Sequence, residues 1–125
     1  MANDLTSLST RVRRTGELNG LWTVRFERAQ AHASAIVVLL NGQLLGGDSG
    51  FFYTGSYEMF DEVFRARIAV TQYDSTVSGP FRFERRCVLI LEGKIGSDTV
   101  SGAGIIAADP TTTYVITLTR QIVML

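Results

Sequence analysis

Residues 41–55 read NGQLLGGDSGFFYTG, and this stretch decides the fold of the 125-residue chain. It follows the apolar run AIVVLL at 35–40. Asn41-Gly42 between two apolar segments is the strongest short-range signal for a β-hairpin, because a type I′ turn needs positive φ at both central residues. Gly46-Gly47-Asp48 predicts a second reversal a few residues later. A chain that turns back this often is predicted to form a β-meander.

The segments on either side of this stretch alternate apolar and polar residues, as half-buried strands do. We expect about eight strands, over 21–27, 33–40, 43–47, 51–57, 63–72, 82–91, 100–107 and 113–121, with a turn region at 93–98 and a break at Asp109-Pro110. Eight antiparallel strands with short connections are typical of a single up-and-down barrel, which leaves no sheet edge exposed. Residues 1–17 are predicted to form a flexible or short helical lead-in, and residues 18–125 the all-β barrel domain.

Composition excludes several classes of function. Apolar residues make up 46% and charged residues 19% of the chain, which is typical of a globular domain rather than a disordered one. Lys plus Arg and Asp plus Glu number 12 each, so no basic footprint indicates direct nucleic-acid binding. No apolar run is long enough to span a membrane, and the first residues lack the apolar core of a signal peptide. We therefore expect a cytoplasmic protein without membrane contact.

The sequence offers little reactive chemistry. Cys87 is the one cysteine and His32 the one histidine, so a dyad of these two is the only nucleophile–base pair available. Cys87 shares its parity with Leu89 and Leu91, which predicts a buried, inert thiol. His32 is predicted to lie at the surface or at a strand end. We expect no metal site, no cofactor and no enzymatic activity.

Two residues at opposite ends of the barrel sequence predict its closed end. Gly20-Leu21-Trp22 opens the first strand, and Arg120 ends the last one. This pattern resembles the signature of lipocalin-type barrels, in which the tryptophan packs across the barrel base under a C-terminal arginine. A guanidinium group stacks well on an indole ring. Tyr53 and Tyr114 are candidates to line an internal cavity with Trp22. Bulky inward residues can equally fill the interior, and we slightly favour a filled or narrow one.

A closer resemblance combines Asn19-Gly20-Leu21-Trp22, the apolar strand that follows, the turns at 41–42 and 46–48, and Tyr53-Thr54-Gly55. Residues 18–73 resemble the GrlR-like family, bacterial regulators first described as negative regulators of type III secretion. The resemblance implies a lipocalin-like barrel that forms a homodimer and binds a protein partner, in the described case a transcriptional activator. In that regulator, an acidic surface segment contributes to activator binding.

The corresponding segment here is the candidate partner-contact patch, Glu58, Met59, Phe60, Asp61 and Glu62, in which two apolar residues that we expect to be exposed interrupt the acidity. The run at 33–40 is apolar at both parities, so we place the dimer contact on its outward residues Ile36, Val38 and Leu40. The expected function is a non-enzymatic regulator or adaptor that binds another protein. The alternative is a carrier of a small apolar ligand inside the barrel.

Overall fold

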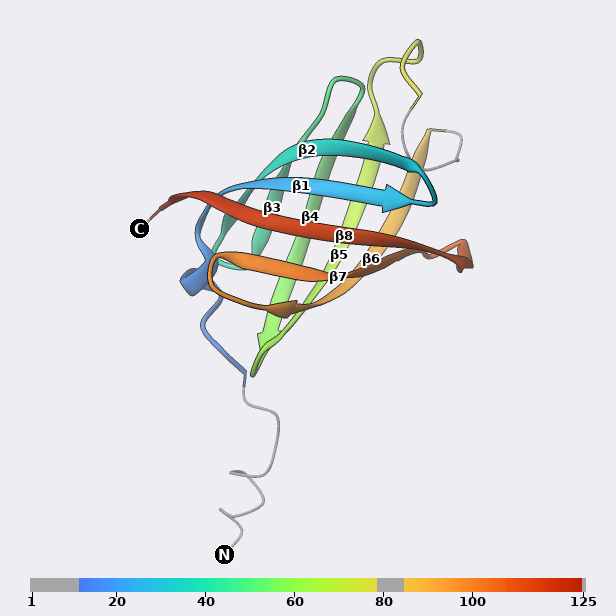
Figure 1. The fold of residues 1–125 in the computed structure, drawn as a ribbon. Coiled ribbons are helices and arrows are strands. Elements are labelled where there is room, and N and C mark those ends of the chain that lie inside the picture. The colour runs from blue at the N-terminus through green and yellow to red at the C-terminus, as the bar shows by residue number, and fades with distance from the viewer. Residues whose placement is uncertain (1–11, 79–84, 125) are drawn as a thin grey trace, which may run out of the picture.

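A computed structural model describes residues 12–78 and 85–124. Eight antiparallel strands form one closed barrel, in which each strand pairs with the next and the last pairs with the first (Figure 1). The elements are η1 (Thr15–Leu18), β1 (Gly20–Arg28), β2 (Ala31–Leu40), β3 (Gln43–Gly47), β4 (Phe51–Phe60), β5 (Val63–Gln72), β6 (Arg86–Ile95), β7 (Thr99–Ile106) and β8 (Asp109–Val123). The predicted fold class is confirmed. The prediction for residues 1–11 lies outside the described residues.

The stretch that decided the fold forms two of the hairpins. Asn41 and Gly42 have φ values of 47° and 89°, as a type I′ turn requires. Gly46 and Gly47 belong to β3, within the strand predicted at 43–47, and the second turn follows at residues 48–50. A Cβ atom on Gly46 would lie 2.1 Å from the carbonyl oxygen of Ile36, so only glycine lets β2 and β3 approach this closely. Asp48 makes the turn itself: its Oδ1 accepts hydrogen bonds from the backbone N–H groups of Gly50 and Phe51, each 3.0 Å long.

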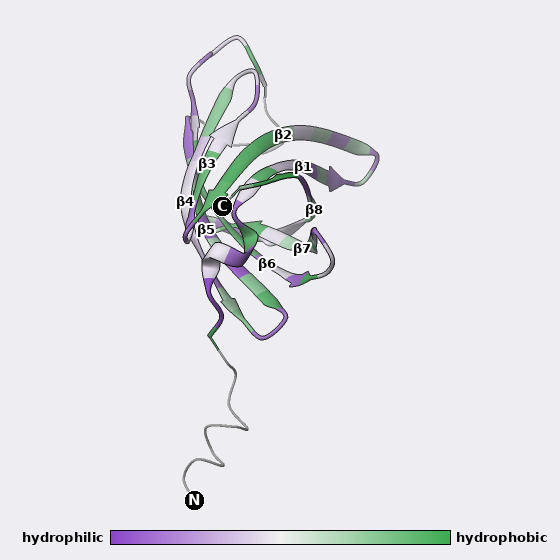
Figure 2. Cartoon of the chain, turned by 90° about the vertical axis from the view of Figure 1, so that its left-hand side faces the viewer, coloured by the Kyte–Doolittle hydropathy of each residue, from purple (hydrophilic) through white to green (hydrophobic). Residues whose placement is uncertain are grey.

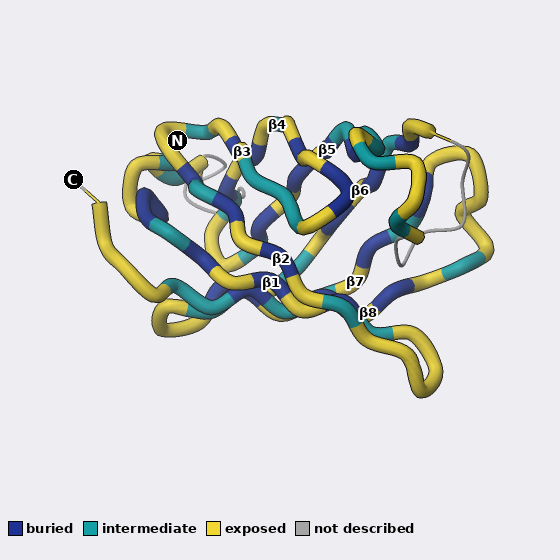
Figure 3. The backbone as a smooth tube through the Cα atoms, turned by 90° about the horizontal axis from the view of Figure 1, so that it is seen from above, coloured by how far each residue is buried: buried dark blue, intermediate teal, exposed yellow. Residues whose placement is uncertain are grey.

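Alternation along the strands builds the core. Buried and exposed residues alternate along most of the chain, as the dark and yellow segments of Figure 3 show. Inward side chains from all eight strands form one cluster, with the largest fully buried side chains being Trp22, Phe64, Leu39, Leu44, Met59, Leu89, Leu91, Ile116 and Leu118. The barrel interior is therefore the hydrophobic core of the protein.

Most strand boundaries differ by a few residues from those predicted, as at the end of β6 and the start of β8. β6 continues through Gly93 to Ile95, because Gly93 faces Gly102 of β7 in the ladder and lies in a strand rather than in a turn. β8 begins at Asp109, which pairs with Ile106. Pro110 lies in the irregularity between that pair and the next, Ile105 with Thr113, where a missing N–H costs no ladder hydrogen bond. Residues 82–84 of the strand predicted at 82–91 lie outside the described residues.

The two ends of the barrel differ. The base carries η1 and the β2–β3, β4–β5 and β6–β7 turns, and the mouth carries the other connections. β3 is short and pairs only with residues Ile36 to Leu40 of β2. The first half of β2 therefore pairs with β1 but not with β3, and the β1–β2 hairpin, which stays paired with β8, extends away from β3 and β4 (Figure 2).

Candidate functional site

Trp22 and Arg120, which the sequence analysis paired, are in contact at the barrel base. The guanidinium carbon of Arg120 lies 5.3 Å from the centre of the Trp22 ring. Trp22 is fully buried, and its Nε1 donates a hydrogen bond to the carbonyl oxygen of Leu18 over 2.9 Å. Arg120 also donates from Nε to Asp98 Oδ1 (2.8 Å) and from Nη1 to the carbonyl oxygen of Glu17 (2.9 Å). These contacts show that Arg120 closes the base and ties η1 to β8 and to the β6–β7 turn.

Asn19 completes the base. It is the one buried polar residue among those that the structure describes. Its side chain bonds to Asn41 in the β2–β3 turn, and its carbonyl oxygen accepts from the N–H of Met124 over 3.0 Å. The start of β1, the β2–β3 turn and Met124 therefore meet at one residue.

The candidate cavity tyrosines lie inside the barrel. Tyr53 is buried, and its hydroxyl donates to Asp48 Oδ2 over 2.6 Å. Burial, followed by the hydrogen bond to Asp48, raises the pKa of Tyr53 far above its ordinary value. The ring of Tyr53 meets that of Phe26 edge to face at 6.1 Å. Tyr114 is also buried and lines the mouth. Tyr53 thus braces the β3–β4 turn from within the core.

The interior itself is filled. The cavity between the inward side chains has a volume of about 20 Å³ and is lined by residues such as Val24, Leu44, Ile68 and Leu118. This volume holds no more than about one water molecule. The bulky inward residues do fill the barrel, as the slightly favoured prediction had it.

Cys87 and His32 lie on different strands and different sides of the wall. Cys87 faces the interior, and burial raises the pKa of its thiol to about 11. His32 is exposed on β2, which does not neighbour β6 in the barrel. The two residues therefore form no dyad. Over the described ranges, no three His, Cys, Asp or Glu side chains are grouped as metal ligands.

The candidate partner-contact patch needs one correction. Met59, expected to be exposed, has 0% of its surface exposed. β4 continues to Phe60, so alternation turns Tyr57 and Met59 into the core and Glu58 and Phe60 outward. The Phe60 ring lies 5.4 Å below the guanidinium carbon of Arg65, and Val12 forms a β-bridge with Phe60. Glu58, Asp61 and Glu62 remain exposed.

The outward face of β2 continues onto its neighbours. Val38 pairs with Leu21 of β1 and with Leu45 of β3, and Leu21 pairs with Ile122 of β8. Ile36 and Leu40 flank Val38 on β2. We call these six residues the apolar band: Leu21, Ile36, Val38, Leu40, Leu45 and Ile122. Ile36 and Leu45 are each 53% exposed, Ile122 is 55% and Leu40 is 43%. The proposed dimer residues thus belong to a row of outward apolar side chains across four strands.

Sequence reasoning missed Leu21, Leu45 and Ile122 as members of the band. Leu21 and Leu45 lie at the outward parity of their own strands. Ile122 has the parity of the inward residues Ile116 and Leu118 and is turned outward by the register shift next to Trp22. Only the register between strands, however, shows that they are neighbours.

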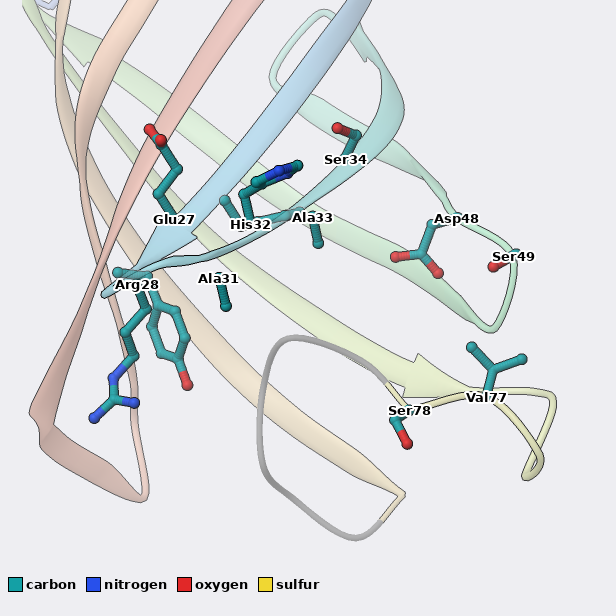
Figure 4. A pocket seen from close by; sticks show the side chains of 12 residues that line it. Glu27, Arg28, Ala31, His32, Ala33, Ser34, Asp48, Ser49, Val77 and Ser78 are labelled. Atoms are coloured by element: carbon teal, nitrogen blue, oxygen red, sulfur yellow. The ribbon is translucent and has the colours of Figure 1, made fainter.

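A hollow of about 340 Å³ lies at the mouth, between the β1–β2 hairpin and two loops (Figure 4). Ala31 and Ala33 of β2 point toward it, with Phe26 and Tyr114 also in its lining. Asp48 and Ser49 stand across from β2, as do Val77 and Ser78. The hollow is open to solvent and separate from the filled interior.

None of the helical residues in the described part of the chain make a segment long and apolar enough to cross a membrane. Comparison of the chain with models of protein families and with curated proteins finds no match.

Proposed function

We propose that this protein is a non-enzymatic regulator or adaptor that acts by binding other proteins and that it forms a homodimer through the apolar band. The observation that carries the proposal is a contrast between the two faces of the barrel wall. The inner face is fully packed, whereas the outer face of β8, β1, β2 and β3 leaves contiguous apolar side chains in solvent. Contiguous exposed apolar surface is typical of protein-binding faces.

The energetics favour covering this band. Fully burying one Leu or Ile side chain contributes about 1.5–3 kcal/mol, and about half of that gain remains for side chains that are half exposed. Ile36, Leu45 and Ile122 are in that state. A two-fold dimer buries each of them twice, because the same patch contributes from both protomers.

The resemblance to GrlR-like regulators supports a protein partner, and a transcriptional regulator in the bacterial cytoplasm is the partner class that it implies. The exposed carboxylates of Glu58, Asp61 and Glu62 would form that contact, with Met59 removed from the patch. A triple charge reversal to lysine tests this patch by capture of partners from the native organism. An unchanged set of captured proteins would remove the patch from the proposal.

The small interior cavity argues against the carrier alternative. A cavity of about 20 Å³ is far below the several hundred Å³ of ordinary small-molecule pockets. Addition of fatty acids or aromatic probes is therefore expected to leave the fluorescence of Trp22 unchanged.

Light scattering coupled to size exclusion tests the homodimer. The full chain is expected to elute as a dimer and the Leu45→Asp variant as a folded monomer. Thr54→Asp is the matched control, because Thr54 pairs with Leu45, faces outward and lies beside the band. A monomeric wild-type chain at high protein concentration would overturn the homodimer.

A further inference from the structure

We propose that the mouth binds an extended peptide segment of a partner protein, which adds as a new strand to the free edge of β2 at His32 and Ser34. This inference rests on the proposed protein-binding function and names the form of partner that it fits. It uses a surface other than the apolar band and the acidic patch.

The edge is free because β2 is longer than the strand beside it. Pairing with β1 runs along β2 from Ala31 to Leu39, whereas pairing with β3 begins at Ile36. Residues 31–35 therefore have a strand neighbour on one side only within the described ranges. A strand edge of this kind presents unpaired N–H and C=O groups to solvent.

Hairpin geometry identifies which groups are unpaired. Arg28 and Ala31 close a two-residue hairpin, and such a closing pair exchanges both hydrogen bonds. The backbone N–H and C=O groups of successive residues point to opposite edges of a strand. Those of Ala31, Ala33 and Ala35 therefore point toward β1, and those of His32 and Ser34 point away from it. The β2–β3 hairpin, closed by Leu40 and Gln43, gives the same parity.

No described residue forms a hydrogen bond with the outward backbone groups of His32 and Ser34, and both residues are exposed. Natural edges are commonly protected by Lys, Pro or an inward charge. The segment 31–35 reads AHASA and carries none of these. The edge is therefore both unpaired and unprotected.

The free edge of β2 forms one wall of the hollow, which therefore has the form of a groove. Asp48–Ser49 and Val77–Ser78 stand opposite (Figure 4). The hollow of about 340 Å³ has room for a few residues of one extended chain and is too small for the paired strands of a second barrel. The occupant that fits is thus a peptide segment rather than a second copy of this chain.

Side chains along the groove define the chemistry of that segment. Ala31 and Ala33 are small and point into the hollow, which Phe26 and Val77 also line. Bulky apolar residues at alternate positions of the peptide would fill this space. The Asp48 carboxylate already accepts from Tyr53, Gly50 and Phe51, so it does not demand a cation from the peptide. We expect an uncharged segment with apolar residues at every second position.

Substitutions at Ser34 separate the contribution of its backbone N–H group to peptide binding from that of its side chain. Ser34→Pro removes an N–H group that faces solvent, a position where an edge strand tolerates proline. Ser34→Ala removes only the hydroxyl group and is the matched control. The probe is a displayed library of random twelve-residue peptides selected on the full-length chain, followed by synthetic peptides of the enriched sequences.

Peptides with apolar residues at alternate positions are expected to be enriched, and to slow amide exchange at His32 and Ser34. They should bind the wild-type chain and Ser34→Ala equally, and Ser34→Pro at least about tenfold more weakly. If Ser34→Pro fails to fold, peptides N-methylated at alternate residues supply the same test, and an unweakened N-methylated peptide overturns the proposal.

Three other results overturn it. The first is a library without enrichment. The second is equal binding to Ser34→Pro, which would place the peptide elsewhere and leave the protein-binding function standing. The third is a dimer that Ser34→Pro dissociates and Leu45→Asp does not, since the occupant of the edge would then be a second copy.

Discussion

Asn19 and Asn41 exchange two hydrogen bonds across the base of the barrel. The backbone N–H of Asn41 donates to Asn19 Oδ1 over 2.7 Å, and Asn19 Nδ2 donates to Asn41 Oδ1 over 3.1 Å. Asn41 is also the first central residue of the turn that identified the fold. The pair therefore fixes the β2–β3 hairpin to the start of β1.

Asn19→Ala is expected to lower the free energy of unfolding by about 1–3 kcal/mol, because it leaves the N–H of Asn41 without its acceptor in a partly buried site. Urea unfolding followed by Trp22 fluorescence measures the change. Gln43→Ala, at an exposed position of the same hairpin, is the control and should shift the unfolding free energy by less than about 0.5 kcal/mol. Equal values for the two variants would contradict the role of the pair.

Substitutions of Arg120 test whether its positive charge alone, or its planar set of N–H donors, stabilises the barrel base. Arg120→Met removes the contacts to Trp22, Asp98 and Glu17 and should cost about 2–3 kcal/mol of unfolding free energy. Arg120→Lys keeps the charge but cannot stack or reach all three partners, so we expect about half to all of that loss. Full stability in Arg120→Lys, measured by urea unfolding, would show that charge alone closes the base.

Met59 and Phe60 form a matched pair that tests the corrected patch. Met59→Gln places an amide without a partner in the core and should cost about 3 kcal/mol of unfolding free energy. Phe60→Gln loses its contact with Arg65 on the outer face and should cost about 1 kcal/mol or less. Thermal unfolding of both variants measures the difference. A larger loss at Phe60 than at Met59 would contradict the inward direction of Met59.

Alkaline pH should destabilise the fold partly through Cys87. Its pKa is raised to about 11 by burial, so the folded chain keeps the thiol proton that the unfolded chain loses from about pH 9. The stabilisation is complete below the unfolded pKa and is lost as pH rises through the folded one. The unfolding free energy should fall between about pH 9 and 11 with a slope of at most about 1.4 kcal/mol per pH unit from this group.

Cys87→Ala is the control for that slope. Burial also raises the pKa values of Tyr53 and Tyr57, so a residual decline in stability is expected in the variant. A pH dependence identical to that of the wild-type chain would exclude Cys87 as its source.

Most of the fold could be predicted from the sequence because alternation and turn residues are local signals. Alternation placed Trp22, Phe64 and Tyr114 inside, and Asn41-Gly42 placed the first hairpin, because both signals act within a few residues. Gly93 was read as a turn because glycine is rare within strands, and only its partner Gly102 explains it.

The candidate site was harder to predict, for two reasons. Charges at 58–62 were read as a loop, although the strand continues to Phe60 and buries Met59. The apolar band and the free edge both depend on register, including the pairing of β1 with β8. A period-two pattern gives the face of a residue but not its partner on another strand, so neither surface was visible from one strand alone.

Closure of β1 against β8 has a consequence for how the protein is made. The ribosome delivers the strands in chain order, and β1 waits for its second neighbour until almost the whole domain has emerged. Throughout synthesis, the nascent sheet therefore carries an exposed edge at its first strand, together with apolar side chains that have not yet been enclosed. Chaperone dependence and aggregation should concentrate in this interval, which ends when the final strand docks.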